Sequence, residues 1–155
     1  MRKMLPLLVC AALIIGISSC RTTGGVAKKI TVKSGQLPPE IATEDFILVG
    51  QLAGRKSYDK YLRKNFEKYT GKYVLATEKE LNTTYADTEK YRFVMDYNRE
   101  SRSIMVNGQF SEATSYRYYI LDRKENKKYT RKSGSGQFSK EIEAYLKAIE
   151  LTRKK

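Results

Sequence analysis

The sequence predicts an α+β domain, in which two amphipathic helices cover a small, mostly antiparallel sheet. Two observations lead to this prediction. Apolar residues recur at helical spacing in 58–69 and 138–151. In 91–97 an aromatic or other apolar residue stands at every second position, which is strand periodicity. A chain of 155 residues has room for one such domain. The expected order of elements is strand, helix, strand, strand, strand, helix (β-α-β-β-β-α).

The first half of the predicted domain holds two strands around a helix. Residues 46–49 are a short apolar run, typical of a buried strand. In the helix over 58–69, Ser57 is a candidate N-cap and Gly71 a candidate C-terminal stop. Residues 73–75 follow as the second strand, so this half reads as strand, helix, strand.

The second half predicts strands that are joined by short turns. Residues 91–97 show strand periodicity, and residues 103–106 are expected to pair with them across a turn at 98–102. Residues 116–121 form another alternating strand, and a short return strand begins at Tyr129. The hairpin connections are the reason to expect a mostly antiparallel sheet.

The N-terminal residues differ in kind from the rest of the chain. Arg2 and Lys3 precede the apolar segment Met4–Ile17. That segment is too short for a membrane span of roughly 20 residues, but it has the length of a signal-peptide core. It ends in Ile17-Ser18-Ser19-Cys20, a branched apolar residue followed by two small residues and a cysteine.

These first 20 residues resemble the signal peptide and lipobox of bacterial lipoproteins. The resemblance implies cleavage between Ser19 and Cys20, lipid attachment to the Cys20 thiol, and acylation of the new amino terminus. Several acyl chains hold a protein on a membrane where a single chain binds only marginally. Two alternatives stay open, namely an ordinary secretory signal with a coincidental cysteine and a cytosolic protein with an apolar first helix.

The composition then divides the chain into three parts. Residues 1–19 are the predicted signal peptide, residues 20–43 a flexible tether, and residues 44–155 one α+β domain. Pro38-Pro39 forbids helix within the tether and favours extended backbone. The alternative for residues 30–32, which are all β-branched, is an edge strand of the domain.

The residues that most catalytic and metal sites need are absent. The chain contains no histidine, and its two cysteines are Cys10, in the signal peptide, and Cys20. The mature chain therefore lacks a His-based triad, a thiol nucleophile and a thiolate or His-ligated metal site. We predict no enzyme, no catalytic residue, no metal and no cofactor, and we keep a small hydrolase as the third functional hypothesis.

One candidate binding site is a glycine-rich turn before the last predicted helix. Gly134, Ser135 and Gly136 follow Arg131 and Lys132. Backbone amides at a helix start, with nearby cations, can hold an anion. The motif is neither a P-loop nor a dinucleotide fingerprint, and the alternative is a plain turn.

Twelve tyrosines and no tryptophan make up the second distinctive feature. Tyrosines could line a carbohydrate-stacking or protein-binding surface, but most fall on the apolar faces of predicted elements, where they would fill the edges of layers. Tyr119 differs, because the alternation of its strand places it opposite Tyr116 and Tyr118. With Arg117, it is expected on an exposed face of the sheet.

The charge of the chain is strongly positive. Thirty Lys+Arg against 17 Asp+Glu give a net charge of +13, which becomes +11 when Arg2 and Lys3 leave with the signal peptide. This excess fits a solvated surface, or attraction to anionic lipids, lipopolysaccharide phosphates or wall polymers. Nucleic acid is the least favoured reading of this charge, and we predict no nucleic-acid partner, because the signal removes the protein from the cytoplasm.

Together these features predict a lipoprotein of the bacterial cell envelope that works as a non-enzymatic binding or accessory module. Its expected partners are the membrane, through the anchor, and envelope proteins, peptidoglycan or anionic lipids. The alternative is a binder of anionic envelope polymers or lipids through basic clusters. Arg21 is not the aspartate that retains enterobacterial lipoproteins in the inner membrane, so the outer membrane is favoured. The composition resembles Bacteroidota lipoproteins, and the element order loosely resembles envelope lipoproteins that activate peptidoglycan synthases.

Overall fold

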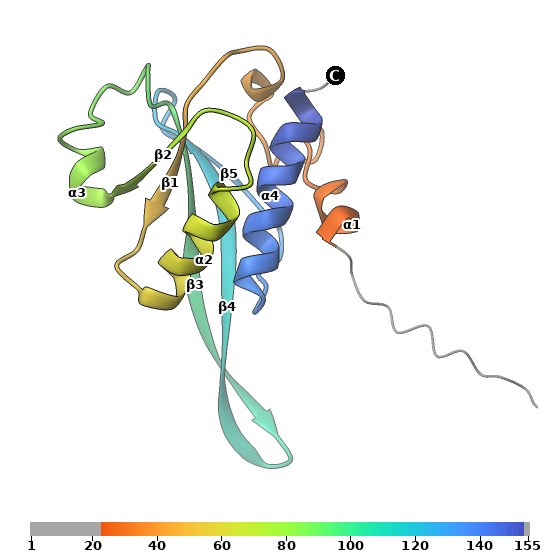
Figure 1. Cartoon of the computed structure of the whole chain (residues 1–155). Helices are drawn as coiled ribbons and strands as arrows, with labels where there is room; N and C mark the ends of the chain where they lie inside the picture. The colour runs from red at the N-terminus through yellow and green to blue at the C-terminus, as the bar shows by residue number, and fades with distance from the viewer. Residues whose placement is uncertain (1–22, 154–155) are drawn as a thin grey trace, which may run out of the picture.

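A computed structural model describes residues 23–153 as a five-stranded sheet with its main helices on one face (Figure 1). The predictions on the signal peptide, the lipobox and Cys20 lie outside the described residues. The strands are β1 (Leu48–Leu52), β2 (Tyr73–Thr77), β3 (Phe93–Val106), β4 (Gln109–Asp122) and β5 (Lys127–Thr130). The helices are α1 (Thr23–Ala27), α2 (Lys56–Phe66), α3 (Glu78–Leu81) and α4 (Phe138–Arg153), with a 3-10 turn η1 (Pro39–Ala42).

The sheet is mixed, with the strand order β2-β1-β3-β4-β5. Strand β1 runs parallel to both β2 and β3, whereas β3, β4 and β5 are antiparallel neighbours. The α+β class is therefore confirmed, but the mostly antiparallel sheet and the four-strand order are wrong. The connection from β1 to β2 contains α2, and the connection from β2 to β3 contains α3, so both are crossovers that keep the strands parallel.

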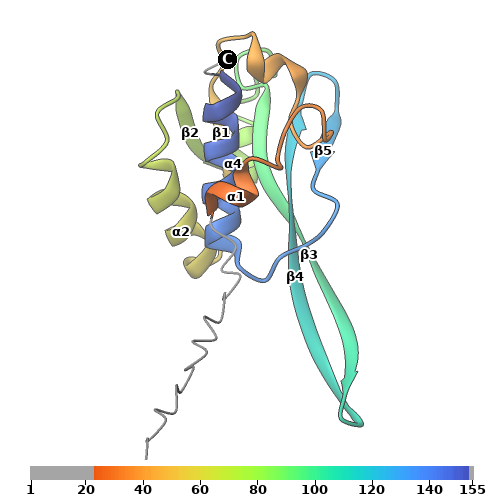
Figure 2. The same ribbon diagram turned by 90° about the vertical axis from the view of Figure 1, so that its right-hand side faces the viewer.

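The two predicted amphipathic helices are confirmed as α2 and α4, and they cover the same face of the sheet (Figure 2). Their apolar stripes meet the side chains that alternate strand residues direct toward that face. The largest fully buried side chains of this core include Phe66, Phe93, Tyr118, Ile120 and Tyr145. A smaller cluster, around Val49, Ala76, Leu81 and Val94, lies on the opposite face.

The predicted flexible tether is wrong for residues 23–43, because this segment packs on the domain. Ala27, Ile30, Leu37 and Ile41 are at most 2% exposed and belong to the main core. These apolar residues are widely spaced in a mostly polar segment and show neither helical nor strand periodicity, so the sequence pattern does not predict their burial. Residues 30–32 form no strand. The packed domain therefore includes residues 23–43.

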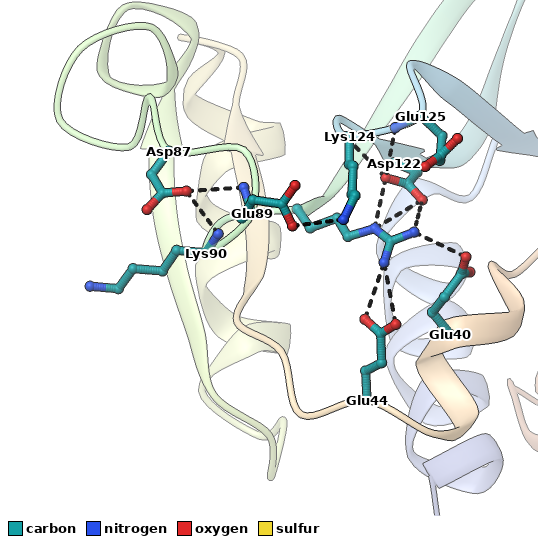
Figure 3. A network of polar contacts seen from close by, with 9 residues as sticks. Glu40, Glu44, Asp87, Glu89, Lys90, Asp122, Lys124 and Glu125 are labelled. Carbon is teal, nitrogen blue, oxygen red and sulfur yellow. Dashed lines mark hydrogen bonds and ion pairs between the residues drawn. The ribbon is translucent and has the colours of Figure 1, made fainter.

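An ionic network around the buried side chains of Arg92 and Asp122 holds the N-terminal segment against the sheet (Figure 3). The Arg92 guanidinium donates from Nε and Nη2 to Asp122, at 3.0 and 2.7 Å. It also donates from Nη2 to Glu40 at 3.0 Å and from Nη1 to Glu44 at 3.1 Å. Arg92 precedes β3 and Asp122 ends β4, so one side chain links η1 and its following loop to two strands.

The buried position of Asp122 depends on these hydrogen bonds. Burial by itself would raise the pKa of Asp122, but the hydrogen bonds from Arg92 and from the backbone N–H groups of Glu125 and Lys124 hold this pKa below its usual value. The ionised carboxylate is thus favoured in the folded state. Its contribution to stability is present above the ordinary pKa of aspartate, near ~4, and is lost as the pH falls below it.

We expect Asp122→Asn to lower the free energy of unfolding by about 3 kcal/mol at pH 7, because it leaves a buried guanidinium without its bidentate partner. The difference from the parent should shrink at about pH 3, below the ordinary pKa of aspartate, where the parent begins to lose the contribution of the charged carboxylate. Urea unfolding at both pH values measures this. Asp45→Asn, which breaks an exposed ion pair with Lys72, is the control and should change stability little. An equal loss in both variants would contradict the role of the network.

Candidate functional site

Strands β3 and β4 continue far beyond the rest of the sheet as a two-stranded arm (Figures 1 and 2). Only residues 93–95 of β3 pair with β1, and only residues 119–122 of β4 pair with β5. The β3–β4 ladder nevertheless runs on to the pair Val106–Gln109. We call residues 99–116 the arm and the pair Arg99–Tyr116 its root. Both figures show the arm projecting past the ends of α2 and α4.

A tight turn at Asn107-Gly108 closes the arm. Both residues have positive φ, 51° and 77°, as a two-residue type I′ hairpin turn requires. The predicted turn at 98–102 is wrong, because these residues continue β3 without interruption. Asn-Gly between two alternating segments is a strong hairpin signal, and it is the sequence feature that would have placed the turn correctly.

The end of the arm is apolar on both of its faces. We call residues 103–111 the arm tip, and this stretch contains no charged residue. Met105 lies directly opposite Phe110, and they are 64% and 78% exposed. Ile104 and Val106 point to the other face and are 42% and 51% exposed. Exposed apolar clusters of this kind mark sites of interaction.

The part of the arm between its root and its tip, which we call the shaft, is polar, and an ionic cluster joins it to Arg117 just beyond the root. Arg117 lies 3.0 Å from Glu100 across the two strands, and Arg102 lies 3.6 Å from the same carboxylate. On the other face, Ser101 and Thr114 oppose each other. The apolar exposure is thus confined to the tip, and a polar shaft separates it from the domain.

An open hollow of about 530 Å³ lies beside the root of the arm, at the carboxyl ends of β1 and β2. The chain leaves β1 for α2 on one face of the sheet and leaves β2 for α3 on the other. Such a topological switch point is a common ligand position in α/β sheets. Its lining includes the exposed cations Arg55, Lys79 and Arg99.

Asp96 also lines this hollow and is hydrogen-bonded by a buried tyrosine. The hydroxyl of Tyr119 donates to Asp96 Oδ2 at 2.6 Å. Burial raises the pKa of Asp96, and the hydrogen bond from Tyr119 offsets only part of that effect. The expectation of an exposed Tyr119 is wrong, since it is 5% exposed. The ammonium group of Lys128 lies 4.4 Å from the centroid of the Tyr119 ring. The Lys128 side chain therefore helps to cover Tyr119 on its face of the sheet.

The structure brings together four of the five residues of the predicted anion site. Arg131, Gly134, Ser135 and Gly136 line a second hollow, of about 540 Å³, and Lys132 is not part of its lining. The backbone N–H of Ser135 donates to the Tyr116 carbonyl, and Arg131 pairs with Glu141. These contacts occupy two of the groups that were expected to hold an anion. Anion binding here stays a prediction.

Exposed cations gather at the end of the domain from which the arm projects. Arg55 and Lys56 begin α2, Arg99 lies at the root, and Lys132 and Lys140 flank the second hollow. That hollow lies beside the root, because Ser135 pairs with Tyr116. At the opposite end of the sheet, cations are engaged with carboxylates, as the Arg92 network and two further ion pairs show. A group of exposed cations therefore lies around the root of the arm.

Comparison with known proteins gives no match, since no family model, curated protein or solved structure matches the chain. Within residues 23–153, no helix is long and apolar enough to cross a membrane. The same residues hold no group of three or more acidic side chains suited to a metal ion. The arm and its root are the features that a functional proposal has to explain.

We expect Asp96→Asn to raise the free energy of unfolding at pH 7. The raised pKa of Asp96 means that its charged form is disfavoured in the folded state, so stability falls as the pH rises above the ordinary value near ~4. Asparagine keeps an acceptor for Tyr119 without the charge. Urea unfolding should show the gain at pH 7 and none at about pH 3. Glu112→Gln, an exposed change on the arm, is the control; a loss of stability in Asp96→Asn at pH 7 would contradict the prediction.

Proposed function

We propose that this protein is a lipid-anchored, non-enzymatic binding module of the bacterial cell envelope, and that the arm is its binding element. The observation that carries the proposal is the apolar tip at the end of a two-stranded ribbon. The lipobox Ile17-Ser18-Ser19-Cys20 supports the anchor. Arg21 favours the outer membrane, and envelope proteins, peptidoglycan and anionic lipids are the partner classes.

The arm is energetically unfavourable in water when no partner covers it. A two-stranded hairpin is at best marginally stable in water, and its outer edges leave backbone N–H and C=O groups unpaired. In addition, Met105 and Phe110 expose most of their apolar surface. Burying that surface would release ordered water and stabilise the arm. A binding role therefore accounts for a feature that folding by itself would not favour.

The anchor and the arm belong to the same end of the domain in this proposal. Cys20 precedes Thr23 by three residues, and α1, which begins at Thr23, packs against α4. Thr23 lines the second hollow together with Ser135, which pairs with Tyr116 at the root. A lipid on Cys20 would hold the domain close to the membrane, with the arm on the membrane side.

A second candidate function is binding of anionic envelope polymers at the hollow beside the root. Arg55, Lys79 and Arg99 line this hollow and are exposed, and they outnumber its two carboxylates, Glu78 and Asp96. Phosphate and carboxylate groups of such polymers would suit this set of cations.

We expect Cys20→Ala to abolish acylation, whereas Cys10→Ser should leave the mature protein unchanged because Cys10 lies in the segment that is removed. Intact-mass measurement of the protein from the membrane fraction gives the number of acyl chains and the position of cleavage. The anchor proposal fails if the parent carries no acyl mass at Cys20, or if Cys20→Ala yields the same mature mass apart from the substitution.

The second candidate predicts salt-sensitive binding to anionic polymers. Replacing both Arg55 and Arg99 by alanine should reduce co-sedimentation with isolated lipopolysaccharide or wall polymer, and raising the salt concentration should weaken binding of the parent. Lys72→Ala, at the far end of the sheet, is the control. Binding that resists salt and survives the double substitution would count against this function.

A further inference from the structure

We propose that the arm tip inserts into the outer part of the bilayer that carries the lipid anchor. This inference rests on the proposed function and names the partner of its binding element. The ligand is the lipid bilayer itself, contacted through Ile104, Met105, Val106 and Phe110.

The distribution of apolar surface on the tip fits a surrounding medium. Met105 and Phe110 occupy one face of the ribbon, while Ile104 and Val106 occupy the other. A partner that docks against one face would leave the second pair exposed to water. Lipid surrounds an inserted hairpin and covers both faces together. The absence of charge throughout residues 103–111 removes the main cost of entering the bilayer.

The reach of the arm agrees with the position of the anchor. From the root at Arg99, seven residues lead to Val106, which corresponds to about 23 Å at ~3.3 Å per residue. The three residues from Cys20 to Thr23 span at most about 10 Å. When Thr23 is taken at the level of the root, with which it shares a hollow, and the arm is normal to the membrane, the end of the arm lies at least about 13 Å beyond the anchor, the length of roughly four strand residues.

This length coincides with the tip. Four residues back from the turn lead to Ser103, and the charged residues Arg102 and Glu112 come next on the two strands. The acyl chains on Cys20 begin at the inner side of the headgroup layer, which is about 5–7 Å thick, so an arm end that lies beyond the anchor brings the apolar side chains to the acyl carbons. Deeper entry is opposed because lipid cannot satisfy the unpaired edges of the ribbon.

The charge around the root suits the same orientation. Arg55, Lys56, Arg99, Lys132 and Lys140 surround the root and are exposed. With the tip inserted, these cations come near the lipid headgroups, where anionic lipids attract basic residues. A second copy of the chain is a weaker candidate for the tip, because the shaft that would pair along another arm is polar.

A single tryptophan at the tip tests the insertion. The chain contains no tryptophan, so Phe110→Trp introduces the only reporter. The full-length lipidated protein is reconstituted into phosphatidylethanolamine and phosphatidylglycerol vesicles, with or without brominated acyl chains. We expect the Phe110→Trp variant to show blue-shifted emission and to lose most of its tryptophan fluorescence in the brominated vesicles.

Two further variants control for position and for damage to the fold. Ser101→Trp places the reporter on the same face of the arm but in its polar shaft, and its fluorescence should change little with bromination. Met105→Trp, directly opposite Phe110, should repeat the loss seen at position 110. Intact mass and co-sedimentation are measured on the same samples, so that the anchor and the insertion are read separately.

Unquenched fluorescence at positions 105 and 110, in protein that carries lipid and sediments with the vesicles, overturns the insertion and leaves the anchor standing. If acrylamide also fails to quench these reporters, the tip is buried against protein, which likewise overturns it. Quenching by brominated lipid in a protein that lacks acyl mass would refute the anchor and support the insertion.

Discussion

The antiparallel ladder between β3 and β4 is the constraint on which the rest of this structure depends. Both strands have 14 residues and pair along their whole length, from Phe93–Asp122 to Val106–Gln109. At one end, the ladder supplies Phe93, Met95, Tyr118 and Ile120 to the core and receives β1 and β5 as neighbours. At the other end, the same register holds the arm tip away from the domain. Because one continuous ladder spans both regions, the position of the tip is set by the packing of the core.

The N-terminal segment matters for the same geometry. Its apolar residues enter the core, and Arg92 ties η1 and the loop after it to the first residues of the ladder. Because the segment is attached, the domain lacks the freedom of movement that a flexible tether would give it relative to an anchor at Cys20. A long tether would let the domain take any orientation above the membrane. With the proposed anchor at Cys20, a short connection to Thr23 would put the anchor at the same end of the domain as the root of the arm and the cations around it, so that all three would act on one membrane surface.

The two hollows beside the root show how local contacts modify what a motif suggests. The glycine-rich turn before α4 lies in a hollow, as an anion site would, but the N–H of Ser135 is engaged with Tyr116 and Arg131 with Glu141. The sequence contains no motif that predicts the hollow at the ends of β1 and β2, because the cations that line it come from three separate elements. Its position follows from the parallel arrangement of β1, β2 and β3, which hairpin reasoning does not predict.

Periodicity in the sequence determined the α+β class and the helices α2 and α4, because each carries an apolar stripe whose spacing is a local property. The alternation in 91–97 and 116–121 likewise identified five of the 14 residues of β3 and six of the 14 residues of β4, mainly where these strands pair with the rest of the sheet. Parallel pairing, the burial of Ile30, Leu37 and Ile41, and the Arg92–Asp122 contact join residues far apart in the chain, so only the tertiary structure decided them. The arm lies between these cases. Its Asn-Gly turn can be predicted from the sequence. That the two strands have no neighbouring strand beyond residue 98 depends on where β1 and β5 end, which only the tertiary structure decides.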